Sequence, residues 1–217
     1  MSELRIVTDS SMDMPVGWDK EYEISILPVN INFGEKTFRQ GIDLSVEQFY
    51  RMVNDLKMIP HTSLPSPVQI MDFYRKIANK GDTILSLHVA SKMSGTYNAV
   101  QLAAREIASE FNIFPFDSGN GSAGLAYMCK EARLCQRAGL SVQEIEATLN
   151  WFCLKSEHQK IYFLWRPCLP DPKDDHLLEL AVASRTEFII THNIKDFKGA
   201  EKFNVKPITP KEFLEKL

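Results

Sequence analysis

Short apolar runs alternate with capped helical segments along residues 1–152, and few architectures accommodate that alternation. LRIVTDSS, TILSLHV and IFPF have the length and apolar character of buried strands. Helix starts with the capping-box pattern are predicted at Ser45-Val46-Glu47-Gln48, Ser66-Pro67-Val68-Gln69 and Ser141-Val142-Gln143-Glu144. Strands that alternate with helices normally pair in parallel. The segment therefore predicts an α/β fold, a mostly parallel sheet with helices on both faces.

The rest of the chain restarts this alternation. ILPVNINF is a further strand-like run in the first part, and KIYFL, EFIIT and VKPI are strand-like runs after residue 153. Helices are predicted at HLLELAVAS and from Thr209 onward. Nine of the ten glycines lie before residue 140. We therefore place a boundary near Phe152–Cys153, which divides the chain into residues 1–152 and 153–217.

The bulk composition is that of an ordinary globular protein, with 44% hydrophobic and 24% charged residues and a net charge of −3. That charge gives no strong signal for nucleic-acid binding. The apolar runs are too short for a transmembrane helix, and MSELRIVTDSS lacks the segments of a signal peptide. The four cysteines have no C-x-x-C spacing and are interpreted as reduced thiols. We expect a cytoplasmic protein with no membrane insertion.

Polar clusters mark the ends of several predicted strands in the first part. Three follow strands directly: Thr8-Asp9-Ser10-Ser11, Ser91-Lys92-Met93-Ser94-Gly95-Thr96 and Asp117-Ser118-Gly119. A fourth, His61-Thr62-Ser63, precedes a capped helix. In open α/β sheets, ligands bind outside the carboxyl ends of the strands. These clusters are therefore the candidate ligand site.

Ser94-Gly95-Thr96 carries the sharpest signal, because a helix is predicted to start there directly after a strand. Free N–H groups and the helix dipole favour an anion at such a start, and glycine allows close approach. A carboxylate or a phosphate is the expected ligand. The alternative is that Ser94 is only an N-cap, contributing about 1 kcal/mol. Asp9 and Asp117 likewise either orient a site hydroxyl or cap a loop.

Histidines at positions 61 and 88 are interpreted as structural rather than catalytic. Neither has an evident partner set of nucleophile, base and orienting group in the sequence. The first part therefore predicts a binding site and no catalytic residues.

Several motifs in order resemble the DegV family over residues 4–152: IVTDSS, LPVNINFGEKTFRQGIDLSVEQFY, PHTSLPSP, LHVASKMSGTYNA and FPFDSGNGSAGLAY. The resemblance implies a two-domain binder of one fatty acid, whose acyl chain bacterial members can present to a fatty-acid kinase. It implies that the carboxylate is held by Thr62, Ser63, Ser94, Gly95 and Thr96, with Asp9 and Asp117 in support. By the same resemblance the binder is not itself the catalyst, and no cofactor is expected.

The family pattern continues into a second domain that closes over the acyl tail and adds basic head-group contacts. Residues 153–217 contain no stretch that matches it. Each buried CH₂ contributes about 0.8 kcal/mol, so losing half of the enclosure of a long chain is expected to cost several kcal/mol.

The last part resembles instead the C-terminal half of toxin-type PIN-domain nucleases, in FLWRPCLPDPKDDHLLELAVAS, EFIITHNIKDF and VKPITPKEFLEKL. The resemblance implies a partial PIN-like α/β segment in which Asp174 and Asp196 hold Mg²⁺ or Mn²⁺ for RNA cleavage, since hard cations take carboxylate oxygens. The first-strand Asp and the helix Glu of that family are not found in a PIN-like context.

Two alternatives remain for this last part. Asp171, Asp174 and Asp175 can be a solvated turn and helix start that the helix dipole favours. The whole chain can also be a fusion product with neither activity.

Overall fold

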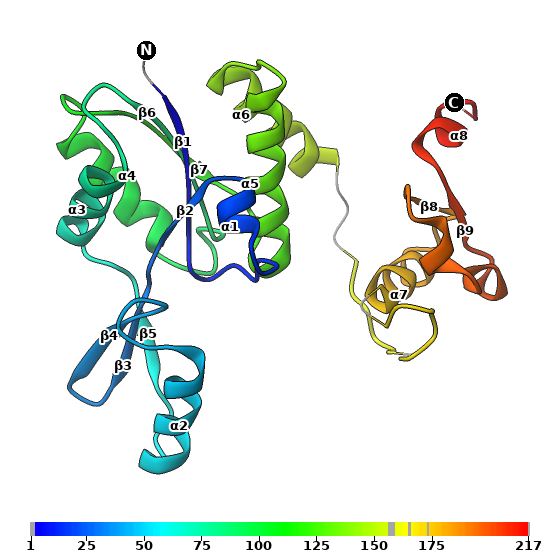
Figure 1. Cartoon of the computed structure of the whole chain (residues 1–217), viewed down its shortest axis with the longest axis horizontal. Helices are drawn as coiled ribbons and strands as arrows, with labels where there is room; N and C mark the ends of the chain where they lie inside the picture. Colours follow the sequence, from blue (N-terminus) through cyan, green and yellow to red (C-terminus); the bar gives the residue numbers. More distant parts are fainter. Residues whose placement is uncertain (1–2, 156–158, 165, 173, 217) are drawn as a thin grey trace. The chain divides into compact units, whose positions relative to one another are not determined.

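The computed structural model describes residues 3–155, 159–164, 166–172 and 174–216 (Figure 1). The chain divides into two compact units, Met1–Lys155 and Ser156–Leu217.

A four-stranded sheet forms the centre of the first unit, and all of its neighbouring strands are parallel. Its order is β2-β1-β6-β7, with Val7 of β1 in register with Ser25 on one side and Ser86 on the other. The strands are β1 (Leu4–Asp9), β2 (Ile24–Leu27), β6 (Thr83–His88) and β7 (Asn112–Asp117). The predicted mostly parallel sheet is therefore confirmed.

Helices cover both faces of this sheet, as the alternation predicts (Figure 1). Ile6 and Leu85 pack on one face with α5 (Ser122–Arg137) and α6 (Val142–Lys155). Val7 and Ile84 pack on the other with α3 (Pro67–Ile77) and α4 (Thr96–Glu106). Successive residues of a strand point to opposite faces, so two adjacent apolar residues in each central strand serve two cores.

A smaller antiparallel sheet, order β4-β3-β5, lies apart from the parallel one within this unit (Figure 1). It consists of β3 (Asn30–Phe33), β4 (Lys36–Arg39) and β5 (His61–Ser63), with helix α2 (Val46–Leu56) packed beside it. A short helix α1 (Trp18–Glu21) precedes β2.

The single strand predicted at ILPVNINF is wrong, because the run splits between the two sheets. Its first part belongs to β2 and its last part is β3. Pro28 has no N–H to donate to a ladder, and the Val29 N–H donates to the Ser10 hydroxyl at 2.9 Å instead of to a strand. The chain therefore leaves the parallel sheet at this dipeptide.

The second unit is built on α7 (Asp175–Ala183) and the parallel pair β8 (Phe188–Ile190) and β9 (Lys206–Ile208). Two 3-10 turns, η1 (Ile194–Phe197) and η2 (Ala200–Phe203), connect the strands, and α8 (Pro210–Leu214) follows them. A small core gathers around Leu169, Leu178, Ala181, Phe197, Ala200 and Val205.

The strand predicted at KIYFL, residues 160–164, is not formed. Among the described residues the sheet of this unit has only β8 and β9, so the run has no neighbour with which to pair. Tyr162, Phe163 and Leu164 are largely exposed.

Capping boxes begin four helices where the sequence predicts them, and the one at Ser141 pairs its backbone N–H and its hydroxyl oxygen with Glu144. The hydroxyls of Ser45, Ser66 and Thr209 accept from the backbone N–H three residues later, and the side chain at that position returns the bond. Among the described parts of the chain, no helix combines the length and the apolar character needed to cross a bilayer.

The two faces of α6 give a test of the fold. Leu149 is 1% exposed in the core, whereas Leu154 on the same helix is 83% exposed. We expect Leu149→Ala to lower the free energy of unfolding by about 2–5 kcal/mol through lost burial and a residual cavity. Leu154→Ala should change it by less than about 0.5 kcal/mol. Urea unfolding measures both, and equal losses would contradict the packing.

Candidate functional site

A cleft of about 720 Å³ lies where the loops after β1 and β6 meet the edge strand β5. Six hydroxyl-bearing residues line it: Ser10, Ser11, Thr62, Ser63, Ser94 and Thr96. Apolar side chains line it as well: Met12, Val29, Leu64, Val89 and Met93. Asp13 and Gln40 complete the lining. The cleft therefore combines a hydroxyl-rich surface with an apolar one.

Ser94, Gly95 and Thr96 form the turn from which α4 starts. Gly95 is the N-cap residue, and the Thr96 N–H donates to the Ser94 hydroxyl oxygen at 3.3 Å. The two hydroxyls are 2.9 Å apart, so one donates to the other and the second keeps its proton free. The first N–H groups of α4 have no intrahelical acceptor and carry the positive end of the helix dipole. The turn is therefore suited to an anion.

Gly95 contributes space rather than a contact with the cleft. It is absent from the lining, and a Cβ built on it would come within 3.2 Å of Leu64 Cδ2. The close approach of this turn to Leu64 brings the start of α4 to the segment that carries Thr62 and Ser63.

Thr62 and Ser63 reach the cleft from β5, and both are exposed. Strand pairing places Thr62 opposite Ile31 and Ser63 opposite Asn30. The Ser63 hydroxyl oxygen accepts from Asn32 Nδ2 at 3.0 Å. Because the amide is the donor there, the proton of the Ser63 hydroxyl is available to a ligand.

Asp9 lies behind the cleft and is fully buried. Its Oδ1 accepts from the N–H of Ser11 at 3.1 Å and from the Ser11 hydroxyl. Its Oδ2 accepts from the Val89 N–H at 3.1 Å and contacts His88 Nδ1 at 3.0 Å. Burial raises the pKa of Asp9, but the hydrogen bonds and charge of His88 and the bonds from Ser11 and Val89 outweigh it and lower that pKa. Asp9 thus joins two loops of the cleft without lining it.

Asp117, at the end of β7, also holds a loop rather than lining the cleft. Its Oδ1 accepts from the N–H of Ser91 at 3.0 Å and of Gly119 at 3.2 Å. Burial raises its pKa, but these hydrogen bonds prevail and lower the pKa of Asp117. The contact to Ser91 fixes the start of the segment that leads to Ser94.

A hydrogen-bonded series of Ser86, His88 and Asp9 was not predicted. Ser86 Oγ lies 2.7 Å from His88 Nε2, and Asp9 takes the other ring nitrogen. The order is that of a hydrolytic triad, but Ser86 is fully buried and also contacts the Tyr74 hydroxyl at 2.8 Å. No substrate can reach it. The sequence signal was the pair of polar residues two apart inside the apolar run TILSLHV.

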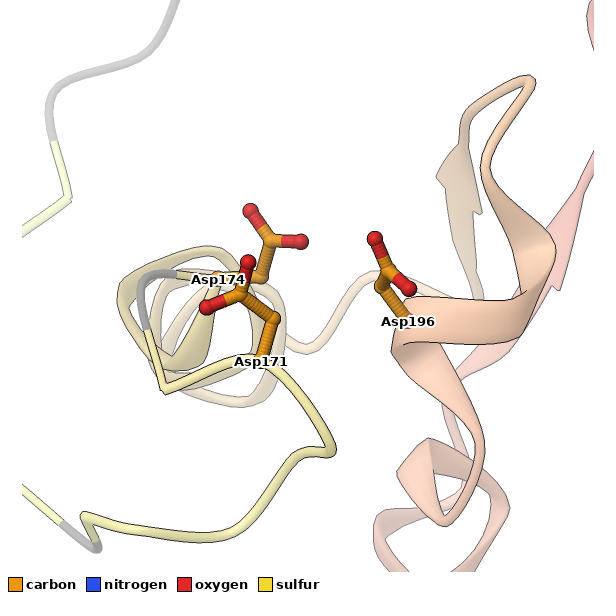
Figure 2. A group of neighbouring side chains, drawn as sticks. All are labelled: Asp171, Asp174 and Asp196. Atoms are coloured by element: carbon orange, nitrogen blue, oxygen red, sulfur yellow. The ribbon is translucent and has the colours of Figure 1, made fainter.

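In the second unit, Asp171, Asp174 and Asp196 point toward one another (Figure 2). One carboxylate oxygen from each lies within 4.8 Å of the others. Asp174 is the N-cap of α7 and Asp196 lies in η1. Burial and the charges of Asp171 and Asp196 raise the pKa of Asp174. The two predicted acids are therefore brought together, with Asp171 as a third.

Asp175 differs from these three, and its interpretation as a solvated residue is wrong. It is 1% exposed, and its Oδ1 accepts from the N–H groups of Cys168 at 3.1 Å and Leu169 at 2.8 Å. A buried carboxyl group needs hydrogen-bond donors of this kind. By accepting from these two N–H groups, Asp175 holds the turn before α7 in place.

Comparison with known proteins agrees with the geometry of the first unit. Residues 3–165 match the protein family described as "Uncharacterised protein, DegV family", which is most of the chain. The chain belongs to the DegV family. DegV domain-containing proteins of Caldanaerobacter subterraneus and Deinococcus radiodurans are each 32% identical to it, over 69% and 68% of this chain.

Two solved structures of fatty-acid-binding proteins align with a similar part of the chain. The fat acid (stearic acid)-binding protein of Eubacterium ventriosum is 28% identical, with a TM-score of 0.61, and covers 69% of this chain and 52% of its own. A fatty-acid-binding DegV family protein of Thermus thermophilus is 26% identical, with a TM-score of 0.57 and the same two coverages. The chain spans about half of the length of the curated DegV relatives it matches.

The charge of Asp9 should control the acid stability of this DegV unit. The pKa of Asp9 in the folded state is below the ordinary 3.8. Its contribution to the free energy of unfolding is therefore fully present above about pH 4 and is lost as the pH falls through the lowered pKa. In Asp9→Asn the amide N–H₂ faces other hydrogen-bond donors and cannot accept from them. We therefore expect this variant to lower the free energy of unfolding by about 1–3 kcal/mol at pH 7.

Denaturant unfolding between pH 2 and 7 measures both effects. The curve for Asp9→Asn should be flatter below pH 4 than that of the wild type. Asp55→Asn, at an exposed position of α2, is the matched control and should keep the wild-type curve. A variant Asp9→Asn with the same acid slope as the wild type would refute the assignment.

Proposed function

We propose that the first unit binds a fatty acid and holds its carboxylate in the cleft between β5 and the start of α4. The observation that carries this proposal is the convergence of the Thr62, Ser63, Ser94 and Thr96 hydroxyls on one cleft at a helix N-terminus. Membership of the DegV family supports it, since solved relatives are fatty-acid binders.

The chemistry of the cleft suits a carboxylate held by hydrogen bonds. Ser63 and one hydroxyl of the Ser94–Thr96 pair keep a proton to donate, and the start of α4 adds N–H groups and positive potential. Among the residues that line the cleft there is no Lys or Arg. The negative charge would therefore be stabilised by dipoles, in a manner that leaves the oxygen atoms accessible.

The apolar part of the lining suits the first carbons of the acyl chain. Leu64 is 44% and Met93 74% exposed, so both have apolar surface that a ligand can cover. Each CH₂ group removed from water contributes about 0.8 kcal/mol. Delivery of the acyl group to a fatty-acid kinase, implied by the DegV resemblance, stays a prediction.

Removing the donors should weaken binding. We expect Ser94→Ala and Thr62→Val each to raise the Kd for oleate about tenfold, the equivalent of one hydrogen bond to a charged group. Displacement of a fluorescent fatty acid measures the Kd. Ser141→Ala removes the cap of α6, whose hydroxyl oxygen accepts from the Glu144 N–H, and should leave the Kd unchanged.

Two results would count against fatty-acid binding at this cleft. One is a wild-type protein that ignores oleate and palmitate in native mass spectrometry. The other is a loss of affinity in Ser141→Ala as large as that in Ser94→Ala, because the effect would then follow helix stability.

A second candidate function, metal-dependent RNA cleavage, is favoured by one observation in the second unit. Asp171, Asp174 and Asp196 gather three carboxylates, which are the donors that Mg²⁺ and Mn²⁺ prefer. A divalent cation between them would offset the repulsion that raises the pKa of Asp174. The cation would supply Lewis acidity at a phosphate. The remaining acids of the PIN pattern are not identified in this chain.

Mn²⁺ titration tests this candidate. We expect Asp174→Asn to weaken Mn²⁺ binding at least about tenfold, whereas Glu187→Gln, an exposed acid of the same unit, should not change it. Because the pKa of Asp174 is raised above 3.8, affinity should fall on acidification at a higher pH than for an ordinary aspartate. RNA cleavage that Mn²⁺ supports and Asp174→Asn abolishes would establish the nuclease; binding without cleavage would leave a cation site only.

A further inference from the structure

A continuous series of buried side chains runs from helix α3 to the cleft. Tyr74 contacts Ser86 at 2.8 Å, Ser86 contacts His88 at 2.7 Å, and His88 contacts Asp9 at 3.0 Å. All four residues are 0% exposed. A buried polar series destabilises the fold unless every member has a hydrogen-bond partner, so the orientation of each side chain is strongly constrained.

The carboxylate of Asp9 fixes the direction of the hydrogen bond between His88 and Asp9. Asp9 is ionised, since its pKa is lowered, and a carboxylate only accepts. His88 Nδ1 therefore carries a proton and donates it to Asp9. Ser86 Oγ lies between His88 Nε2 and the Tyr74 hydroxyl and bonds to both. Burial raises the pKa of Tyr74, which keeps that phenol a donor.

Asp9 transmits this order to the cleft. One of its oxygens is taken by His88 and the Val89 N–H, and the other by the N–H and hydroxyl of Ser11. Val89 and Ser11 both line the cleft. The Ser11 hydroxyl donates its hydrogen bond to Asp9, so only its oxygen lone pairs are available to a ligand. It therefore repels a carboxylate, whereas Ser63 retains a proton for one.

We propose that His88 is a positioning residue of the cleft, which acts through Asp9 to hold the Ser11 hydroxyl as an acceptor and so directs the carboxylate toward Ser63 and Ser94. This inference rests on the proposed fatty-acid binding. Without the bond from His88 the carboxylate of Asp9 can turn, and Ser11 loses its fixed orientation. His88 itself touches no ligand.

Two substitutions of His88 separate positioning from packing. In His88→Asn the amide nitrogen can take the place of Nδ1 and donate to Asp9. In His88→Gln the amide reaches the Nε2 end, toward Ser86, and the donor to Asp9 is lost. We expect His88→Gln to raise the Kd for oleate roughly five- to tenfold and His88→Asn to recover most of that loss.

The effect should also depend on Ser11. In a Ser11→Ala background, His88→Gln should change the Kd by less than about twofold, because the hydroxyl that it orients is absent. Leu149→Ala serves as a control that loses stability in the core without touching this series. Its Kd should equal that of the wild type. Independent, multiplicative effects of His88→Gln and Ser11→Ala would overturn the positioning role.

A spectroscopic measurement keeps the proposal testable if His88→Gln does not fold. Imidazole ¹⁵N spectra of the intact chain should show His88 protonated at Nδ1, and oleate should shift its resonances. The same titration of Ser11→Ala should leave them unmoved. A His88 ring protonated at Nε2 alone, or equal shifts in both proteins, would overturn the proposal. A wild type that binds no oleate would instead remove the proposed function on which it rests.

Discussion

The carboxylate of Asp9 connects the ends of the two central strands, and the shape of the cleft depends on it. It receives four donors, two from the loop after β1 and two from His88 and Val89 at the end of β6. A fully buried charge persists only when donors of this kind replace its hydration. The contacts that stabilise Asp9 are therefore the same contacts that hold Ser11 and Val89 at the cleft.

This arrangement depends in turn on the parallel sheet. Because β1, β6 and β7 run in one direction, their carboxyl ends place Asp9, His88 and Asp117 along a single edge. Asp117 uses its carboxylate as Asp9 does and fixes the segment before Ser94. The small sheet then brings Thr62 and Ser63 to the same edge, since Pro28 turns the chain out of β2 into β3. The cleft forms where a rigid sheet edge meets this separate sheet.

Local signals in the sequence predicted most of the first unit, and long-range contacts account for what was missed. The capping boxes at Ser45 and Ser66 act over three residues, so they can be read from the sequence alone. The split at Pro28 and the failure of residues 160–164 to form a strand depend on whether a partner strand is available, which no local pattern records. The bond between His88 and Asp9 joins residues 79 positions apart, so only the fold reveals it. The convergence of Thr62 with Ser94 is of the same kind and was inferred through family resemblance.

The two candidate sites show how the residues at the start of a helix decide whether a ligand there carries negative or positive charge. The start of α4 offers Ser94, Gly95 and Thr96, which add donors and no charge, so the helix dipole there is free to act on an incoming anion. The start of α7 instead carries two acidic side chains, Asp174 and Asp175, which an incoming anion would meet there. With Asp171 and Asp196 added, negative charge is in excess, and a cation is the ligand that such a cluster can stabilise. The same backbone feature thus supports opposite chemistry in the two units because the side chains around it differ.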